Sequence, residues 1–120
     1  MIKNIVAVAV LTLGAASAPN ALAHAKLISS EPKAASELNT APKEIRLQFN
    51  EVLEPAFSKV KVLGASNVEI PIAKIDIDRA NAQVMVAPLP LLPAGDYRVQ
   101  WSTMTHDGHK TKGEFSFKVK

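Results

Sequence analysis

Polar and apolar residues alternate strictly in the stretch Lys43-Glu44-Ile45-Arg46-Leu47-Gln48-Phe49. In an extended chain Ile45, Leu47 and Phe49 would share one face, and the charged or polar residues would share the other. A half-buried antiparallel strand has this period of two, whereas an amphipathic helix repeats every 3.6 residues. The stretch therefore predicts a strand with one face turned towards a hydrophobic core.

The same alternation recurs in three later segments, 58–62, 97–102 and 115–119, where the intervening residues are again polar or charged. Together with Phe49, the apolar positions of these segments are the predicted core: Val60, Val62, Val99, Trp101, Phe115 and Phe117. We expect replacement of Phe117 by alanine to cost about 3–5 kcal/mol if that ring is buried. The chain has no cysteine, so this core must stabilise the fold without disulfides.

Prolines and glycines separate the alternating segments. Proline cannot donate within a ladder and glycine adopts unusual φ values, so both are expected at turns and strand edges. The positions are Pro32, Pro42, Pro55, Pro71, Pro88, Pro90, Pro93, Gly64, Gly95, Gly108 and Gly113. No window predicts a long helix. Short strands separated by such residues predict an all-β fold, a β-sandwich of about seven strands.

Residues 1–23 have the pattern of a secretory signal peptide. Lys3 precedes an apolar run from Ile5 to Ala18, and Ala21-Leu22-Ala23 is a small-x-small cleavage site. An uncleaved anchor is the alternative, but the run is shorter than the roughly 17–25 residues that a helix needs to cross a bilayer. We therefore expect an exported protein in which residues 24–120 form one domain.

The charge distribution argues against a nucleic-acid partner. The net charge is +3, and the lysines are scattered along the chain, without a basic run or interleaved aromatic residues. Membrane insertion of residues 24–120 is not expected either.

Cleavage after Ala23 would give His24 a free α-amine beside its imidazole, and these two nitrogens can close a chelate ring around a metal ion. The other two histidines lie in Thr105-His106-Asp107-Gly108-His109. Asp107 and His109 would project to one side of an extended chain, and His106 to the other. An amine, two imidazoles and a carboxylate suit tetragonal Cu(II), although zinc also accepts such donors. His106 is a less favoured alternative to His109, and Asp-x-His is by itself a weak motif.

Several ordered motifs resemble the CopC family of periplasmic copper-binding proteins. They are His24-Ala25-Lys26-Leu27, Ser29-Ser30-x-Pro32, Leu47-x-Phe49-x-Glu51, Leu92-Pro93-Ala94-Gly95-x-Tyr97-x-Val99-x-Trp101 and Asp107-Gly108-His109. The resemblance implies a Greek-key sandwich of the cupredoxin-like or immunoglobulin-like kind. It also implies a Cu(II) site made by His24 through its amine and Nδ1, by Asp107, and by a ring nitrogen of His109. Glu51 is a weaker candidate that would lie near the ion or bind it weakly along the axis. The alternative is that Glu51 is simply a solvated carboxylate at the end of its strand.

Some members of that family carry a second, Cu(I) site in a methionine-rich loop. The matching stretch here, 64–72, contains neither methionine nor histidine, and beyond Met1 the chain has only Met85 and Met104. Met85 alternates with Val84 and Val86, which is typical of packing in a strand. The resemblance therefore indicates a member with a Cu(II) site only.

The expected function is that of a periplasmic Cu(II) carrier or buffer in copper resistance or homeostasis, not an enzyme. The resemblance implies a CopD-like inner-membrane protein as a possible partner. Binding would displace protons from nitrogen donors, so affinity should fall with falling pH. Two alternatives remain: a metal-free structural or interaction domain, and a copper-brace oxidase of the polysaccharide monooxygenase type. Asp107 would fill the open position that oxygen chemistry needs, which disfavours the oxidase.

Overall fold

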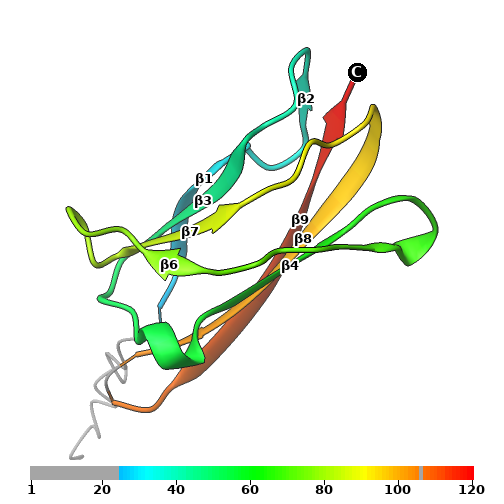
Figure 1. Cartoon of the computed structure of the whole chain (residues 1–120). Coiled ribbons are helices and arrows are strands. Elements are labelled where there is room, and N and C mark those ends of the chain that lie inside the picture. Colours follow the sequence, from blue (N-terminus) through cyan, green and yellow to red (C-terminus); the bar gives the residue numbers. More distant parts are fainter. Residues whose placement is uncertain (1–24, 106) are drawn as a thin grey trace, which may run out of the picture.

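In the computed structural model, which describes residues 25–105 and 107–120, the chain folds into two β-sheets (Figure 1). One sheet has the order β1 (Leu27–Glu31), β3 (Glu44–Phe49), β7 (Val84–Pro88) and β6 (Asp76–Ile77). The other has the order β2 (Ser36–Leu38), β9 (Lys110–Val119), β8 (Gly95–Met104), β4 (Lys59–Leu63) and β5 (Glu69–Ile70). Two short 3₁₀ turns, η1 (Pro55–Phe57) and η2 (Ala65–Asn67), flank β4.

The chain changes sheets before and after β2, and again between β3 and β4, between β5 and β6, and between β7 and β8. Such crossings between antiparallel sheets are typical of a Greek-key sandwich. Among the strands of residues 25–105 and 107–120, only β2 pairs in parallel, with β9. The prediction of an all-β sandwich is confirmed. The described residues form nine strands, not about seven, because β2, β5 and β6 have only two or three residues and are too short to show alternation. No described helix is long and apolar enough to span a membrane.

The core lies between the two sheets, as the alternation predicted. In β3, Ile45, Leu47 and Phe49 are each fully buried. All seven predicted core residues are at most 8 % exposed, and the ring of Phe49 meets that of Trp101 edge to face at 4.9 Å between centroids. Met85 is fully buried too, so its thioether packs in the core as its alternation indicated.

Gly113 does not lie at a turn or a strand edge, and that prediction is wrong. It sits inside β9, directly opposite Trp101 of β8. A Cβ atom built on Gly113 would lie 2.5 Å from Cζ2 of Trp101 and 2.7 Å from its Cε2. The glycine is therefore needed because the indole ring lies over the backbone at this point. The positions of prolines and glycines in the sequence do not reveal this role.

Replacing Gly113 with alanine is expected to destabilise the protein by about 1–3 kcal/mol, because the added methyl group overlaps a buried ring. Chemical denaturation measures the change. Gly64→Ala is the matched control, since its Cβ would find no atom closer than 3.5 Å and its φ of −92° suits alanine. Equal stability of the two variants would show that the indole does not lie over Gly113.

Candidate metal centre

Asp107 and His109 lie in the turn that joins β8 to β9, at one end of the sandwich (Figure 1). The turn is closed by hydrogen bonds from Gly108 N to Thr105 O at 3.0 Å and from Thr105 N to His109 O at 3.2 Å. The segment is thus a tight turn rather than an extended chain, because two long antiparallel strands must reverse within five residues. Gly108 allows the reversal through its φ of +85°.

The turn nevertheless brings the two side chains together. Asp107 Oδ2 lies 2.9 Å from His109 Nδ1, and the side chains are 45 % and 35 % exposed, respectively. The hydroxyl of Thr105 donates to Asp107 Oδ1. This hydrogen bond, followed by the one with His109, lowers the pKa of Asp107 to about 2. The carboxylate is therefore ionised at neutral pH and is ready to act as an oxygen donor beside an imidazole.

The described chain begins next to this turn. Ala25 is 2 % exposed, and its carbonyl accepts a hydrogen bond of 3.0 Å from Thr111 Oγ1, in the strand that follows His109. On the other side, Lys26 N donates to Asn50 Oδ1 at 2.7 Å, and Asn50 N donates to Lys26 O at 3.1 Å. The predicted ligand His24, the alternative ligand His106 and the predicted signal peptide 1–23 lie outside the described residues.

Glu51 follows β3 in the loop that leads to η1, and it is partly buried. This loop reaches the same end of the sandwich, where Glu54 N donates to Met104 O at 3.2 Å. Within residues 25–105 and 107–120, however, no group of three or more histidine, aspartate, glutamate or cysteine side chains could hold a metal ion. Of the predicted ligands, the structure thus brings together Asp107 and His109 and does not add Glu51 to them.

Thr105 and Thr111 support the candidate site through hydrogen bonds, and sequence reasoning missed both. Thr105 orients the carboxylate of Asp107, and Thr111 holds the carbonyl of Ala25. No sequence signal pointed to Thr111, because its partner lies 86 residues away in the chain. Thr105 is 4 % exposed and precedes Asp107 by two residues, a spacing that could have suggested a local side-chain hydrogen bond.

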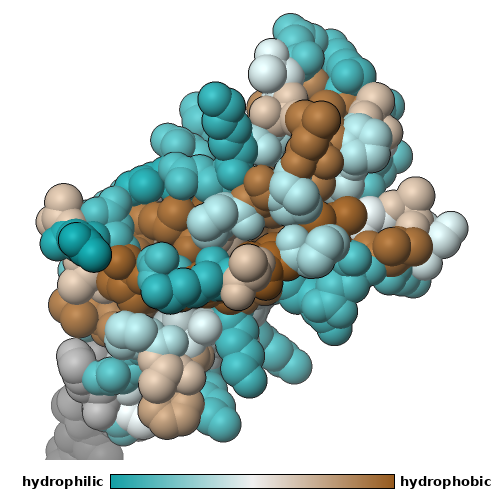
Figure 2. Space-filling view, viewed as in Figure 1, coloured by the Kyte–Doolittle hydropathy of each residue, from teal (hydrophilic) through white to brown (hydrophobic). Residues whose placement is uncertain are grey.

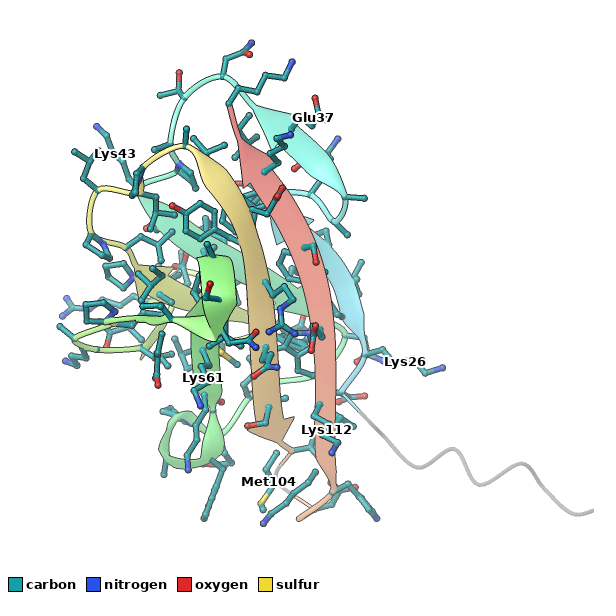
Figure 3. The ribbon with its side chains drawn as sticks, turned by 90° about the vertical axis from the view of Figure 1, so that its right-hand side faces the viewer. Lys26, Glu37, Lys43, Lys61, Met104 and Lys112 are labelled. Carbon is teal, nitrogen blue, oxygen red and sulfur yellow. The ribbon has the colours of Figure 1, made fainter. Side chains whose placement is uncertain are left out.

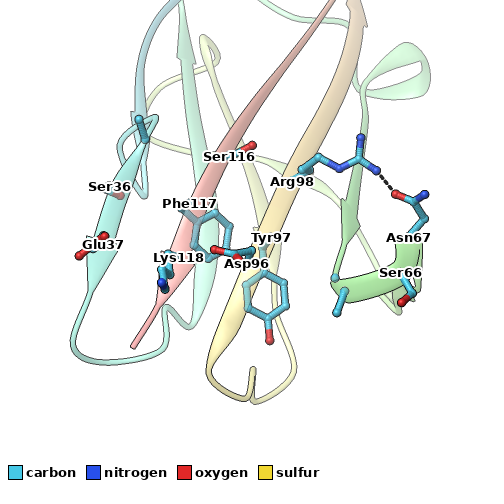
Figure 4. A pocket seen from close by; sticks show the side chains of 13 residues that line it. Ser36, Glu37, Ser66, Asn67, Asp96, Tyr97, Arg98, Ser116, Phe117 and Lys118 are labelled. Carbon is cyan, nitrogen blue, oxygen red and sulfur yellow. Dashed lines mark hydrogen bonds between the residues drawn. The ribbon is translucent and has the colours of Figure 1, made fainter.

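A hollow of about 720 Å³ lies at the opposite end of the sandwich (Figure 4). It is lined by residues of β2, η2, β8 and β9, and Arg98 Nη2 donates to Asn67 Oδ1 across it. Its lining contains no histidine and no methionine. This chemistry does not suit copper, so the hollow is separate from the candidate metal centre.

Comparison with known proteins assigns the chain to a family. The CopC domain family matches residues 27–120. The protein YobA of Escherichia coli K12 is 36 % identical over 115 residues, covering 95 % of this chain and 92 % of YobA. Copper resistance protein C of Escherichia coli is 38 % identical over 108 residues, with 84 % and 85 % coverage. The crystal structure of PcoC, described as a methionine-rich copper resistance protein from Escherichia coli, matches with a TM-score of 0.72 and 38 % identity over 82 % of this chain and all of PcoC.

These matches confirm the resemblance found in the motifs, and with it the β-sandwich fold and a role connected with copper. Two of these relatives are named as copper resistance proteins. CopC proteins bind copper and are not enzymes, which agrees with the prediction of a non-catalytic protein. The chain belongs to the CopC family of copper-binding proteins.

Proposed function

We propose that this chain is exported with the help of a cleavable signal peptide, residues 1–23, and acts in the periplasm as a Cu(II) carrier or buffer. The proposed ligands are His24, Asp107 and His109, and Glu51 is the weaker candidate. One observation carries the proposal: the hydrogen bond from Thr111 to Ala25 places the first described residue beside the turn that holds Asp107 and His109.

A peptide bond joins His24 directly to Ala25, which is buried and hydrogen-bonded. Cleavage after Ala23 would therefore leave the α-amine and imidazole of His24 one residue away from the point that Thr111 of β9 anchors. Asp107 and His109 add an oxygen and a nitrogen. Three nitrogens and one oxygen form a set that Cu(II) accepts in tetragonal geometry, and Cu(II) leads the divalent affinity order at such sites.

The solvent exposure of Asp107 and His109 suits a copper carrier better than a protein that stores copper permanently. Asp107 and His109 keep 45 % and 35 % of their side-chain surface open to solvent, so a second protein could reach the ion directly. Capture displaces protons from an amine and imidazoles, which ordinarily have pKa values of about 7.7–8.0 and 6.5. Because the Asp107 carboxylate stays ionised down to about pH 2, the nitrogen donors would set the pH dependence, and binding would weaken as the pH falls through their range. A CopD-like inner-membrane protein is the proposed recipient.

The test is a Cu(II) titration of the protein recovered from the periplasm, whose mass should correspond to residues 24–120. We expect one Cu(II) ion per chain with a tetragonal EPR spectrum. Outer-shell partners of a metal typically contribute 10–100-fold to affinity, so removing a ligand by His109→Ala or Asp107→Asn should weaken binding at least about tenfold.

His106→Ala is the matched control for His109→Ala, since both changes remove one imidazole from the same five-residue segment, and it is expected to bind Cu(II) like the unmodified protein. If His106→Ala abolishes binding and His109→Ala does not, the imidazole ligand has been misassigned. If none of the variants differs because no form binds Cu(II) specifically, the metal-free domain is the correct alternative.

A further inference from the structure

We propose that the outer face of β4, β8 and β9, at the end next to the candidate metal centre, is a docking surface for an acidic protein that exchanges copper with this chain. The proposal rests on the carrier function above. It names the surface and the charge of the partner, which neither the family nor the names of the relatives provide.

The register of the three strands builds a basic row on this face. Lys59 pairs with Ser102, and Ser102 pairs with Lys112, so the two lysines flank one hydroxyl. Both lysines are exposed, and strands lie about 4.8 Å apart, which places their Cα atoms about 10 Å apart. They line a shallow groove of about 790 Å³ on this face. Figure 3 shows Lys112 and Met104 at the same end of the face, with Lys61 on the neighbouring strand.

The positive charge of the row is not neutralised within the described part of the chain. The groove also contains Glu69 and Glu114, but each of these carboxylates already has a basic partner. Glu69 lies 3.8 Å from Lys61 Nζ, and Glu114 lies 3.4 Å from Arg98 Nη1. No ion pair joins Lys59 or Lys112 to any acidic residue described here. Two lysines therefore remain available to carboxylates of another molecule.

An apolar surface borders the row at the same end. Phe57 of η1 is 52 % exposed and Val52 is 41 % exposed. The hydroxyls of Ser58 and Thr103 are 2.9 Å apart and buried, so they tie the end of η1 to β8, and Phe57 precedes Lys59 by two residues. Figure 2 shows mixed apolar and polar side chains at the lower end of the molecule, where η1 lies. Protein interfaces combine an apolar centre, enriched in aromatic residues, with a polar rim, and complementary charges speed the encounter of the partners.

The charges at this end favour a protein over a lipid surface. Glu51, Glu54 and Asp107 belong to the loops next to the row. A bilayer rich in anionic lipid presents the same charge everywhere, so it would meet these carboxylates as well as the lysines. A protein can place its carboxylates opposite Lys59 and Lys112 alone. The row also lies close to the Asp107–His109 turn, as a handover of copper requires.

The experiment measures binding of a fluorescein-labelled twelve-residue peptide of alternating glutamate and leucine, which has no histidine, cysteine or methionine. Fluorescence anisotropy should show salt-sensitive binding, and the double variant Lys59→Glu/Lys112→Glu should weaken it at least about tenfold because attraction becomes repulsion. Lys33→Glu/Lys43→Glu is the control, because it changes the net charge equally at two exposed lysines. These lysines line one hollow, and Figure 3 shows Lys43 at the opposite end of the molecule. Phe57→Ser should also weaken binding, whereas Val68→Ser, at a residue that is 62 % exposed near η2, should not.

Three outcomes would overturn the proposal: equal losses in the two lysine double variants, binding to vesicles of phosphatidylglycerol but not to the peptide, or a dimer that disappears in Lys59→Glu/Lys112→Glu. The Cu(II) titration of the same variant separates this proposal from the function on which it rests. We expect its copper affinity and EPR spectrum to be unchanged. A protein that binds the peptide and no copper would refute the carrier function, and one that binds copper without the peptide would refute the docking surface.

Discussion

Acetylation of the α-amine of His24 is expected to lower the affinity for Cu(II) at least about 100-fold, or about 2.8 kcal/mol. An acetylated amine is an amide, which does not offer a free electron pair at neutral pH, so the chelate ring at His24 cannot close. This loss should reach or exceed the upper end of the 10–100-fold effects of outer-shell partners, since the acetyl group removes a proposed ligand and not an outer-shell partner. Titration of a semisynthetic chain that begins at acetylated His24 measures it, and the EPR spectrum should report one nitrogen donor fewer.

The matched control carries the acetyl group on the side chain of Lys26, an exposed residue two positions away, and leaves the amine free. It is expected to bind like the unmodified chain. Equal affinity of the two acetylated chains would move the site to the 105–109 turn alone, and His24 would then have no part in it.

Replacement of Phe117 by alanine is expected to destabilise the protein by about 3–5 kcal/mol. Phe117 is 2 % exposed, and its ring stacks on that of Tyr97 at 5.4 Å between centroids. The substitution removes the apolar contacts of a buried ring and leaves a cavity that the two sheets cannot close without shifting. Chemical denaturation, checked by the melting temperature, measures the change.

Phe57→Ala is the control, because Phe57 is 52 % exposed and surface changes usually stay within about 0.5 kcal/mol. A melting temperature of Phe117→Ala equal to that of the unmodified protein would mean that β9 does not turn Phe117 towards the core.

The longest strands could be predicted because each shows its burial in its own sequence. In β3, β8 and β9, every second residue is buried over at least part of the strand. Apolar side chains are favoured at those positions because their transfer out of water stabilises the fold. The strands of two or three residues could not be found, since they are held by pairing with longer neighbours and not by a pattern of their own. Gly113 was misassigned for the same reason: a glycine is required there because the ring of Trp101, on the neighbouring strand β8, leaves no room for a Cβ atom.

Part of the candidate site could likewise be predicted from the sequence, and part depends on the tertiary structure. The residue types of Asp107 and His109 indicated metal binding, and their separation of two residues favoured contact between the two side chains in any compact turn. The turn itself, the hydrogen bond that Thr105 gives to Asp107 and the one that Thr111 gives to Ala25 all depend on how β8 and β9 reverse at the end of the sandwich.

The sequence by itself thus determined the all-β class, the inward faces of the main strands and the candidate donors of the proposed site, because alternation and residue type are local properties. Only the tertiary structure decided that Ala25 lies against β9, that Gly113 must leave room for an indole ring and that Lys59 and Lys112 flank one hydroxyl. These contacts join residues that are distant in the chain, and they are set by the pairing register and by the packing of the two sheets.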